Sequence, residues 1–202
     1  MPAYEHLTDK RFLQVVPFVL NSEGGFVNNP KDPGGPTHRG IAYNFNVVIL
    51  REFGIFTPDQ IKNLTADQAR EIYFRKYWKA VNIGKIKDTS YAYCVFDAAV
   101  NQGPAWASLH MNYKSQEFDG DGKNVKLFQE LRRSFLRARN KAYFSYRGFD
   151  EFGEGWTNRL LDVATFAERV KPPAKVIGLF PVQQPEPPEY PQELWLMLDS
   201  VA

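Results

Sequence analysis

The segment from residue 28 to residue 36 constrains the fold more than any other, because seven of its nine residues are Asn, Pro or Gly. Proline removes a backbone donor and glycine disfavours helices, so this segment indicates a tight hairpin or an ordered loop. Before it, apolar residues recur at the spacing of one helical face: Phe12, Val15, Val16, Val19 and Leu20. We therefore predict a first helix that is capped by Thr8, kinked or interrupted at Pro17, and ended by Gly24.

The rest of the chain to about residue 170 is dominated by helical patterns. A capping box, in which Gln68 follows Thr65 by three residues, predicts a helix that ends near Trp78. Further helices are predicted over residues 41–50, 91–102, 105–113, 125–146 and 156–169. The expected fold class is mainly α, with a short hairpin or loop after the first helix.

Composition excludes few classes of protein. The net charge of +2 gives no argument for nucleic acid, and one cysteine, Cys94, cannot staple the fold and is interpreted as a core residue. The first ten residues lack a secretory pattern, and no apolar run approaches the roughly 18 residues of a membrane span, so no stable membrane insertion is expected.

One stretch of the chain is strongly basic. Between residues 123 and 147 eight basic residues accompany a single acid, Glu130. This face could approach an anionic polymer, or it could be an ordinary solvated helix face. The eight are Lys123, Lys126, Arg132, Arg133, Arg137, Arg139, Lys141 and Arg147.

The chemistry of the chain is expected where the first helix meets the hairpin. Glu23 stands at the end of the helix, and the hairpin after it carries Asp32 and Thr37. A carboxyl backed by apolar residues can stay protonated near neutral pH and act as a general acid in glycoside hydrolysis. A second carboxylate can stabilise the cation, or a hydroxyl can orient a water. The alternative is a helix-terminal Glu followed by a purely structural turn.

The segments Glu23-Gly-Gly-Phe26 and Asp32-Pro-Gly-Gly-Pro-Thr37-His-Arg-Gly-Ile41 resemble the N-terminal motif of glycoside hydrolase family 108. Members of that family are lysozyme-like N-acetylmuramidases, often phage endolysins, and the resemblance implies a lysozyme-like fold with Glu23 as catalytic residue. Phe26 stands where the family usually has Tyr. Four residues separate Asp32 from Thr37, where phage lysozymes commonly have five, so the roles of these two residues are less defined.

The second half of the chain resembles the family's C-terminal predicted peptidoglycan-binding region. The matching segments are Phe96-Asp-Ala-Ala-Val-Asn-Gln-Gly-Pro104, Phe118-Asp-Gly120 and Gly155-Trp-Thr-Asn-Arg159. The resemblance divides the chain into a lysozyme-like catalytic section (1–87), a helical predicted peptidoglycan-binding section packed on it (88–170) and a tail (171–202). The tail contains half of the chain's 14 prolines and is expected to be extended.

Four further residues are candidates for substrate binding. His38 follows Thr37 and could contact substrate or support the loop. Asn101, Gln102 and Trp106 could hold N-acetyl groups and sugar faces, although Asn101 could instead cap backbone groups in the core.

No metal or organic cofactor is expected. The segment 119–123 places Lys123 at a ligand position of a calcium loop, and the three histidines lack the spacing of a zinc site.

The expected function is a peptidoglycan hydrolase that cleaves the β-1,4 bond between N-acetylmuramic acid and N-acetylglucosamine, for phage-mediated lysis or entry. The alternatives are a lytic transglycosylase or chitinase on the same scaffold, or a non-enzymatic wall-binding or secretion-accessory protein. The expected partners are peptidoglycan glycan strands, with no nucleic acid, and a phage virion component is an option for the tail. The chain would be made in the host cytoplasm without a signal peptide and act in the periplasm or cell wall, released by a holin or carried in the virion.

Overall fold

The computed structural model describes residues 4–20, 25–30, 32–112 and 125–170. Helices dominate this part of the chain, with one short two-stranded sheet, which confirms the prediction of a mainly α, lysozyme-like class with a short hairpin. Short 3₁₀ or π segments are labelled η. In chain order the elements are η1 (Glu5–Thr8), α1 (Lys10–Leu20), β1 (Thr37–His38), β2 (Ile41–Ala42), α2 (Tyr43–Glu52), η2 (Pro58–Asn63), α3 (Ala66–Tyr73), η3 (Phe74–Lys79), η4 (Ile83–Lys85), α4 (Thr89–Asn101), α5 (Pro104–His110), α6 (Val125–Ser145) and α7 (Phe149–Arg169).

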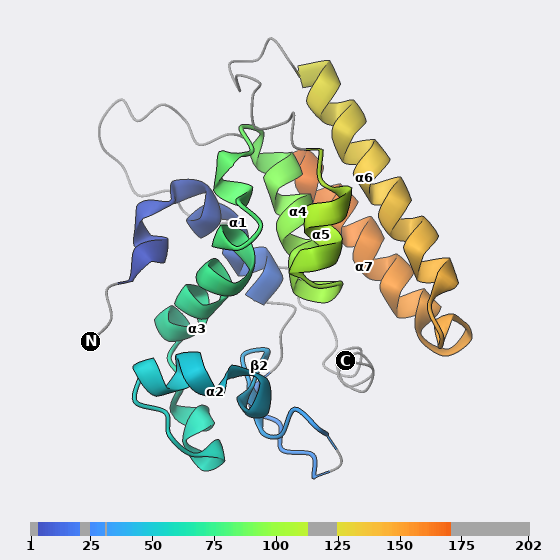
Figure 1. The fold of residues 1–202 in the computed structure, drawn as a ribbon. Helices are drawn as coiled ribbons and strands as arrows, with labels where there is room; N and C mark the ends of the chain where they lie inside the picture. Colours follow the sequence, from blue (N-terminus) through green and yellow to red (C-terminus); the bar gives the residue numbers. More distant parts are fainter. Residues whose placement is uncertain (1–3, 21–24, 31, 113–124, 171–202) are drawn as a thin grey trace.

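Figure 1 shows these elements in two groups. The helical group contains α1, α4, α5, α6 and α7, and the small lobe contains β1, β2 and α2. α3 runs between them and continues into the π-helical segment η3, since the residue that ends α3 keeps helical backbone angles. The chain thus crosses from the small lobe back to the helical group along one continuous helical rod.

α4 is the central helix of the helical group. Eleven of its 13 residues, from Thr89 to Ala99, are buried, and it packs against α1, α5, α6 and α7. A helix that is apolar on all sides is buried on all sides, and three alanines on α4 let its neighbours approach closely. The side chain of Asp88 caps it by accepting a hydrogen bond from the Tyr91 N–H at 2.7 Å.

Three aromatic rings join α4 to the two elements beside it. Phe12 on α1, Trp78 on η3 and Phe96 on α4 meet edge to face, and each pair of ring centroids lies 5.5 Å apart. All three are buried. Cys94 lies nearby in the same core, as predicted, and burial raises the pKa of its thiol to about 12.

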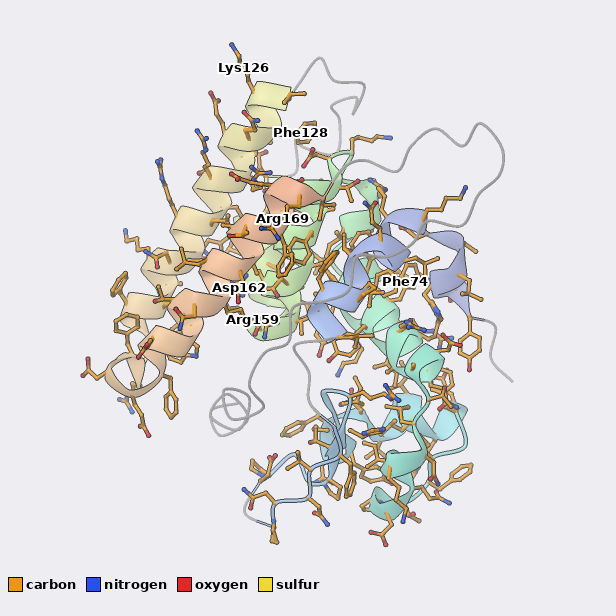
Figure 2. The ribbon with its side chains drawn as sticks, turned by 180° about the vertical axis from the view of Figure 1, so that it is seen from behind. Phe74, Lys126, Phe128, Arg159, Asp162 and Arg169 are labelled. Atoms are coloured by element: carbon orange, nitrogen blue, oxygen red, sulfur yellow. The ribbon has the colours of Figure 1, made fainter. Side chains whose placement is uncertain are left out.

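A buried carboxylate joins α4 to the α6–α7 pair. Asp97 Oδ2 lies 2.6 Å from Arg139 Nη1 of α6, and Asp97 Oδ1 lies 3.0 Å from Arg159 Nη2 of α7. Figure 2 labels Arg159 on α7. Arg139 was predicted on the basic face of this helix; it is instead fully buried, because the same helix face that carries Phe128 and Phe135 turns it toward Asp97.

A second buried ionic cluster fixes the N-terminal turn. His6 Nδ1 lies 2.7 Å from Glu71 Oε2 on α3, and the other oxygen of Glu71 accepts from Arg75 Nε at 2.7 Å. Both His6 and Glu71 are fully buried. The cluster therefore ties η1 to the rod formed by α3 and η3.

The starts of two helices differ from the sequence-based expectation, and α1 is not interrupted at Pro17. Asp9, not Thr8, caps α1, since its Oδ1 accepts from the N–H groups of Arg11 and Phe12. Pro17 lies inside α1, which continues to Leu20. α7 begins at Phe149, seven residues before the predicted start, because Gly148 adopts a φ of 88° and caps the helix there. None of the helices in the described ranges is long and apolar enough to cross a membrane.

Replacing Asp97 by Asn should lower the free energy of unfolding by about 3–5 kcal/mol, because Arg139 would be left buried without a countercharge. Chemical denaturation of the two proteins measures this loss. Glu5→Gln is the matched control: Glu5 forms an exposed ion pair with Lys79, and its loss should cost less than about 1 kcal/mol. Equal losses for both variants would contradict the role given to Asp97.

The two buried acids should also make the protein sensitive to acid. Burial alone would raise the pKa of Asp97, but Arg159 and Arg139 outweigh it and the pKa lies below the ordinary value; for Glu71, hydrogen bonds from His6 and Arg75 likewise outweigh burial. A carboxyl group whose pKa is lower in the folded protein than in the unfolded chain stabilises the fold at pH values above the unfolded-chain pKa of about 4. This stabilisation is lost as the pH falls toward the pKa of the folded protein. Unfolding free energies measured from pH 6 to pH 2 should fall, and less steeply for Asp97→Asn.

Candidate active site

The predicted hairpin consists of the two-stranded sheet β1–β2 and an isolated bridge between Val27 and Thr37. Val27 and Thr37 exchange two backbone hydrogen bonds of 2.8 Å, and β1 pairs antiparallel with β2 so that Thr37 faces Ala42 and His38 faces Ile41. The backbone of Thr37 is therefore paired on both sides, with Val27 and with Ala42, whereas His38 is paired with Ile41. This confirms that the Gly- and Pro-rich segment is an ordered hairpin.

The turn between β1 and β2 is formed by two residues in the left-handed region. Arg39 has a φ of 53° and Gly40 a φ of 70°, the combination found in two-residue hairpin turns. Glycine adopts this conformation without strain, whereas Arg39 is held in it by contacts with the small lobe and α3. Its Nε donates to the Leu64 carbonyl at 3.2 Å, and its own carbonyl accepts from the Tyr73 hydroxyl at 3.4 Å.

Asp32 lies in the turn at the far end of the hairpin. Its Oδ1 accepts a hydrogen bond of 2.7 Å from the Gly34 N–H, and its carbonyl accepts one of 3.0 Å from the Gly35 N–H. An Asp side chain that bonds the backbone two residues later stabilises a turn by itself. Asp32 thus has a structural role in addition to the chemical role predicted for it.

Thr37 is half-buried, and its hydroxyl donates to the Gly35 carbonyl at 3.2 Å. A hydroxyl oxygen that donates its proton in this way keeps its lone pairs, so it can still accept a hydrogen bond from a water. The predicted acid, Glu23, lies outside the described residues, which resume at Gly25. Its role and those of Asp32 and Thr37 stay predictions.

His38 lies against the residues that precede the hairpin. Its ring meets that of Phe26 edge to face with centroids 6.4 Å apart. Burial and the charge of Arg39 lower the pKa of His38. The ring contact with Phe26 places His38 against the chain three residues after Glu23.

Asn101, Gln102 and Trp106 lie at the junction of α4 and α5, in the helical group. Asn101 Nδ2 donates to the Asp97 carbonyl at 2.8 Å, so its amide bonds its own helix. Gln102 Nε2 donates to the Tyr146 hydroxyl at 3.0 Å, and Trp106 stacks on His110 with centroids 3.9 Å apart. The structure thus places the predicted site residues in two groups. Asp32, Thr37 and His38 lie on one hairpin, and the other three lie at the α4–α5 junction.

A lysine and an asparagine that the sequence did not single out connect the rod to the hairpin. Lys76 Nζ of η3 donates to Asn46 Oδ1 of α2 at 2.6 Å, and Asn46 Nδ2 donates to the Ala42 carbonyl at 2.7 Å. Ala42 is the residue that pairs with Thr37. Lys76 stands in a helix rich in charged residues, so no sequence pattern distinguishes it. Within the described ranges, no three His, Cys, Asp or Glu side chains gather as a metal site requires.

Comparison with known proteins identifies relatives of the chain. The model of glycosyl hydrolase 108 matches residues 16–103, a span that includes Glu23 and the hairpin that carries Asp32 and Thr37. A solved structure, that of SagA from Brucella abortus, is 30% identical, covers 78% of this chain and 94% of its own, and superposes with a TM-score of 0.56. None of the curated proteins searched matches. The family match, together with 30% identity over 94% of the SagA chain, shows that this chain belongs to glycosyl hydrolase family 108 and is a glycosyl hydrolase.

Proposed function

We propose that the chain is an N-acetylmuramidase, which hydrolyses the β-1,4 bond between N-acetylmuramic acid and N-acetylglucosamine in peptidoglycan. One observation carries this proposal: the family model matches the part of the chain that contains the end of α1, Glu23 and the ordered hairpin. Glycoside hydrolysis requires a proton donor at the leaving oxygen and a group that stabilises or traps the cation across the sugar ring. The motif supplies both kinds of group within 15 residues of chain.

In this mechanism Glu23 protonates the glycosidic oxygen as the bond to the anomeric carbon breaks. The positive charge that develops on the sugar ring is stabilised by Asp32, or is met by a water that Asp32 and Thr37 hold. The water adds its oxygen to the anomeric carbon and loses a proton to a carboxylate. The Thr37 hydroxyl, whose proton is engaged by Gly35, is suited to accept a hydrogen bond from that water.

Peptidoglycan as the partner is supported by the outer face of α6. Lys126, Arg133, Arg137 and Lys141 are exposed and recur at spacings of seven, four and four residues, which places them along one face. Figure 2 shows Lys126 pointing away from the molecule at the start of this helix. Such a face attracts the carboxylates of the wall polymer. Action in the periplasm or cell wall, in phage-mediated lysis or entry, belongs to the same proposal and rests on the family resemblance.

One observation favours a second candidate function. The Asp32 carboxylate already holds the hairpin turn through Gly34. A lytic transglycosylase on this scaffold would need only Glu23 and would release an anhydro sugar, leaving Asp32 with its structural role.

The role of Glu23 is tested by the loss of turbidity of purified peptidoglycan. Glu23→Gln removes the proton donor and should lower the rate at least about a hundredfold, because general acid catalysis contributes 10²–10⁴. Glu154→Gln, on the exposed surface of α7, is the control and should keep the wild-type rate. Lysis that survives Glu23→Gln would refute the assignment, and a wild type that sediments with the wall without lysing it would identify a wall-binding protein.

Asp32→Asn separates the structural role of Asp32 from its chemical role. Asn keeps an oxygen that can accept from the Gly34 N–H, so the hairpin should remain folded while the negative charge is lost. A muramidase that uses this charge should lose about ten- to a hundredfold in rate. An unchanged rate in the same turbidity assay would favour the transglycosylase, and circular dichroism checks that the variant is folded.

A further inference from the structure

The cations along α3 and η3 differ in their partners. Arg70 pairs with Asp67 at 2.6 Å, Arg75 with Glu71 at 2.7 Å and Lys79 with Glu5 at 2.6 Å. Lys76 differs from them, because the acceptor of its Nζ among the described residues is the amide oxygen of Asn46, which carries no charge. A neutral acceptor orients an ammonium group but does not neutralise it.

The surroundings of Lys76 make this lack of a countercharge costly. Lys76 is half-buried, and its Nζ lies 5.9 Å from the centroid of the Tyr77 ring. Removing a cation from water without a countercharge is unfavourable, and burial accordingly lowers the pKa of Lys76. An anionic ligand at this position would relieve that cost.

Lys76 is also connected to the hairpin that carries Asp32 and Thr37. Asn46 is buried, with 8% of its surface exposed, and its two hydrogen bonds link Lys76 Nζ to the Ala42 carbonyl beside Thr37. The amide is fixed at both ends, so it sets the direction of the ammonium group. Lys76 lies in a π-helical segment, a local distortion that is frequent at functional sites.

We propose that Lys76 binds a carboxylate carried by the N-acetylmuramic acid unit of the substrate. One N–H of its ammonium group is engaged by Asn46, and among the described residues the other two have no acceptor that would compete with a ligand. The carboxylate is that of the lactyl group in peptide-free glycan, or one of the stem peptide where the peptide is present. N-acetylglucosamine carries neither, so Lys76 would distinguish the two sugars of the strand. The inference rests on the proposed function, since it concerns the substrate of that site.

Binding of two tetrasaccharides to the full chain with Glu23→Gln tests this proposal without hydrolysis. One is the peptide-free glycan of alternating N-acetylglucosamine and N-acetylmuramic acid, and the other is the N-acetylglucosamine tetramer, which lacks the lactyl carboxylates. Isothermal titration should show the muramic glycan binding roughly tenfold more tightly, a typical contribution of a hydrogen bond to a charged group. Lys76→Met should remove this difference, and Lys76→Arg should retain most of it. A third arm, the muramic glycan with stem peptides, identifies which carboxylate is bound.

Lys79→Met is the matched control, because it removes a cation three residues away that is already paired with Glu5. It should leave the preference for the muramic glycan unchanged. A Lys76 that only joins η3 to α2 would give equal losses of affinity for both glycans, which overturns the proposal. An unchanged preference in Lys76→Met would also overturn it, and so would a Glu23→Gln chain with Lys76 intact that binds neither glycan.

These outcomes are independent of the lysis assay. A chain that lyses peptidoglycan but binds both tetrasaccharides alike would keep the proposed function and lose the role of Lys76. A chain that prefers the muramic glycan through Lys76 but lyses nothing would keep the role of Lys76 and lose the proposed function.

Discussion

The contact of Asp97 with Arg139 and Arg159 is the constraint on which the helical group depends. α4 is buried on nearly every side, so a carboxylate on it can be accommodated only with countercharges, and α6 and α7 each supply one. The two arginines reach Asp97 only when the α6–α7 pair packs against α4. The backbone carbonyl of Asp97 also accepts a hydrogen bond from Asn101, so the network reaches the α4–α5 junction. The contact of Asp97 with Arg159 joins two of the segments that resemble the family, residues 96–104 and 155–159.

The small lobe is held differently, by a few polar contacts with one rod, which include an ion pair of 2.8 Å between Arg75 of η3 and Glu52 of α2. Tyr73 and Lys76 reach from α3 and η3 to the carbonyl of Arg39 and the amide of Asn46, and these two points flank the β1–β2 hairpin. A hairpin of such short strands has little stability of its own. Its geometry, and with it the position of Thr37, is therefore set by contacts with the rod that crosses between the two groups.

The sequence predicts what local rules determine. The hairpin follows from its Asn, Pro and Gly residues, and the start of α3 from the reciprocal bonds of Thr65 and Gln68, which the structure shows at 3.2 and 2.9 Å. Tertiary contacts determine the rest. Arg139 belongs to a basic stretch, and only the packing of α6 on α4 shows that it is buried. Lys76 differs from the neighbouring cations only in its acceptor, which is a neutral amide where theirs are carboxylates. The role of Glu23 stays a prediction from its motif, which lies within the residues that the family model matches.

The central claim is the bond that the enzyme cleaves, and the reducing ends of its products test it most directly. Purified peptidoglycan digested by the wild type would be reduced with borohydride and its fragments identified by mass spectrometry. The account predicts fragments that end in reduced N-acetylmuramic acid. Fragments that end in reduced N-acetylglucosamine or in anhydro-muramic acid, or a wall that yields no fragments, would contradict it.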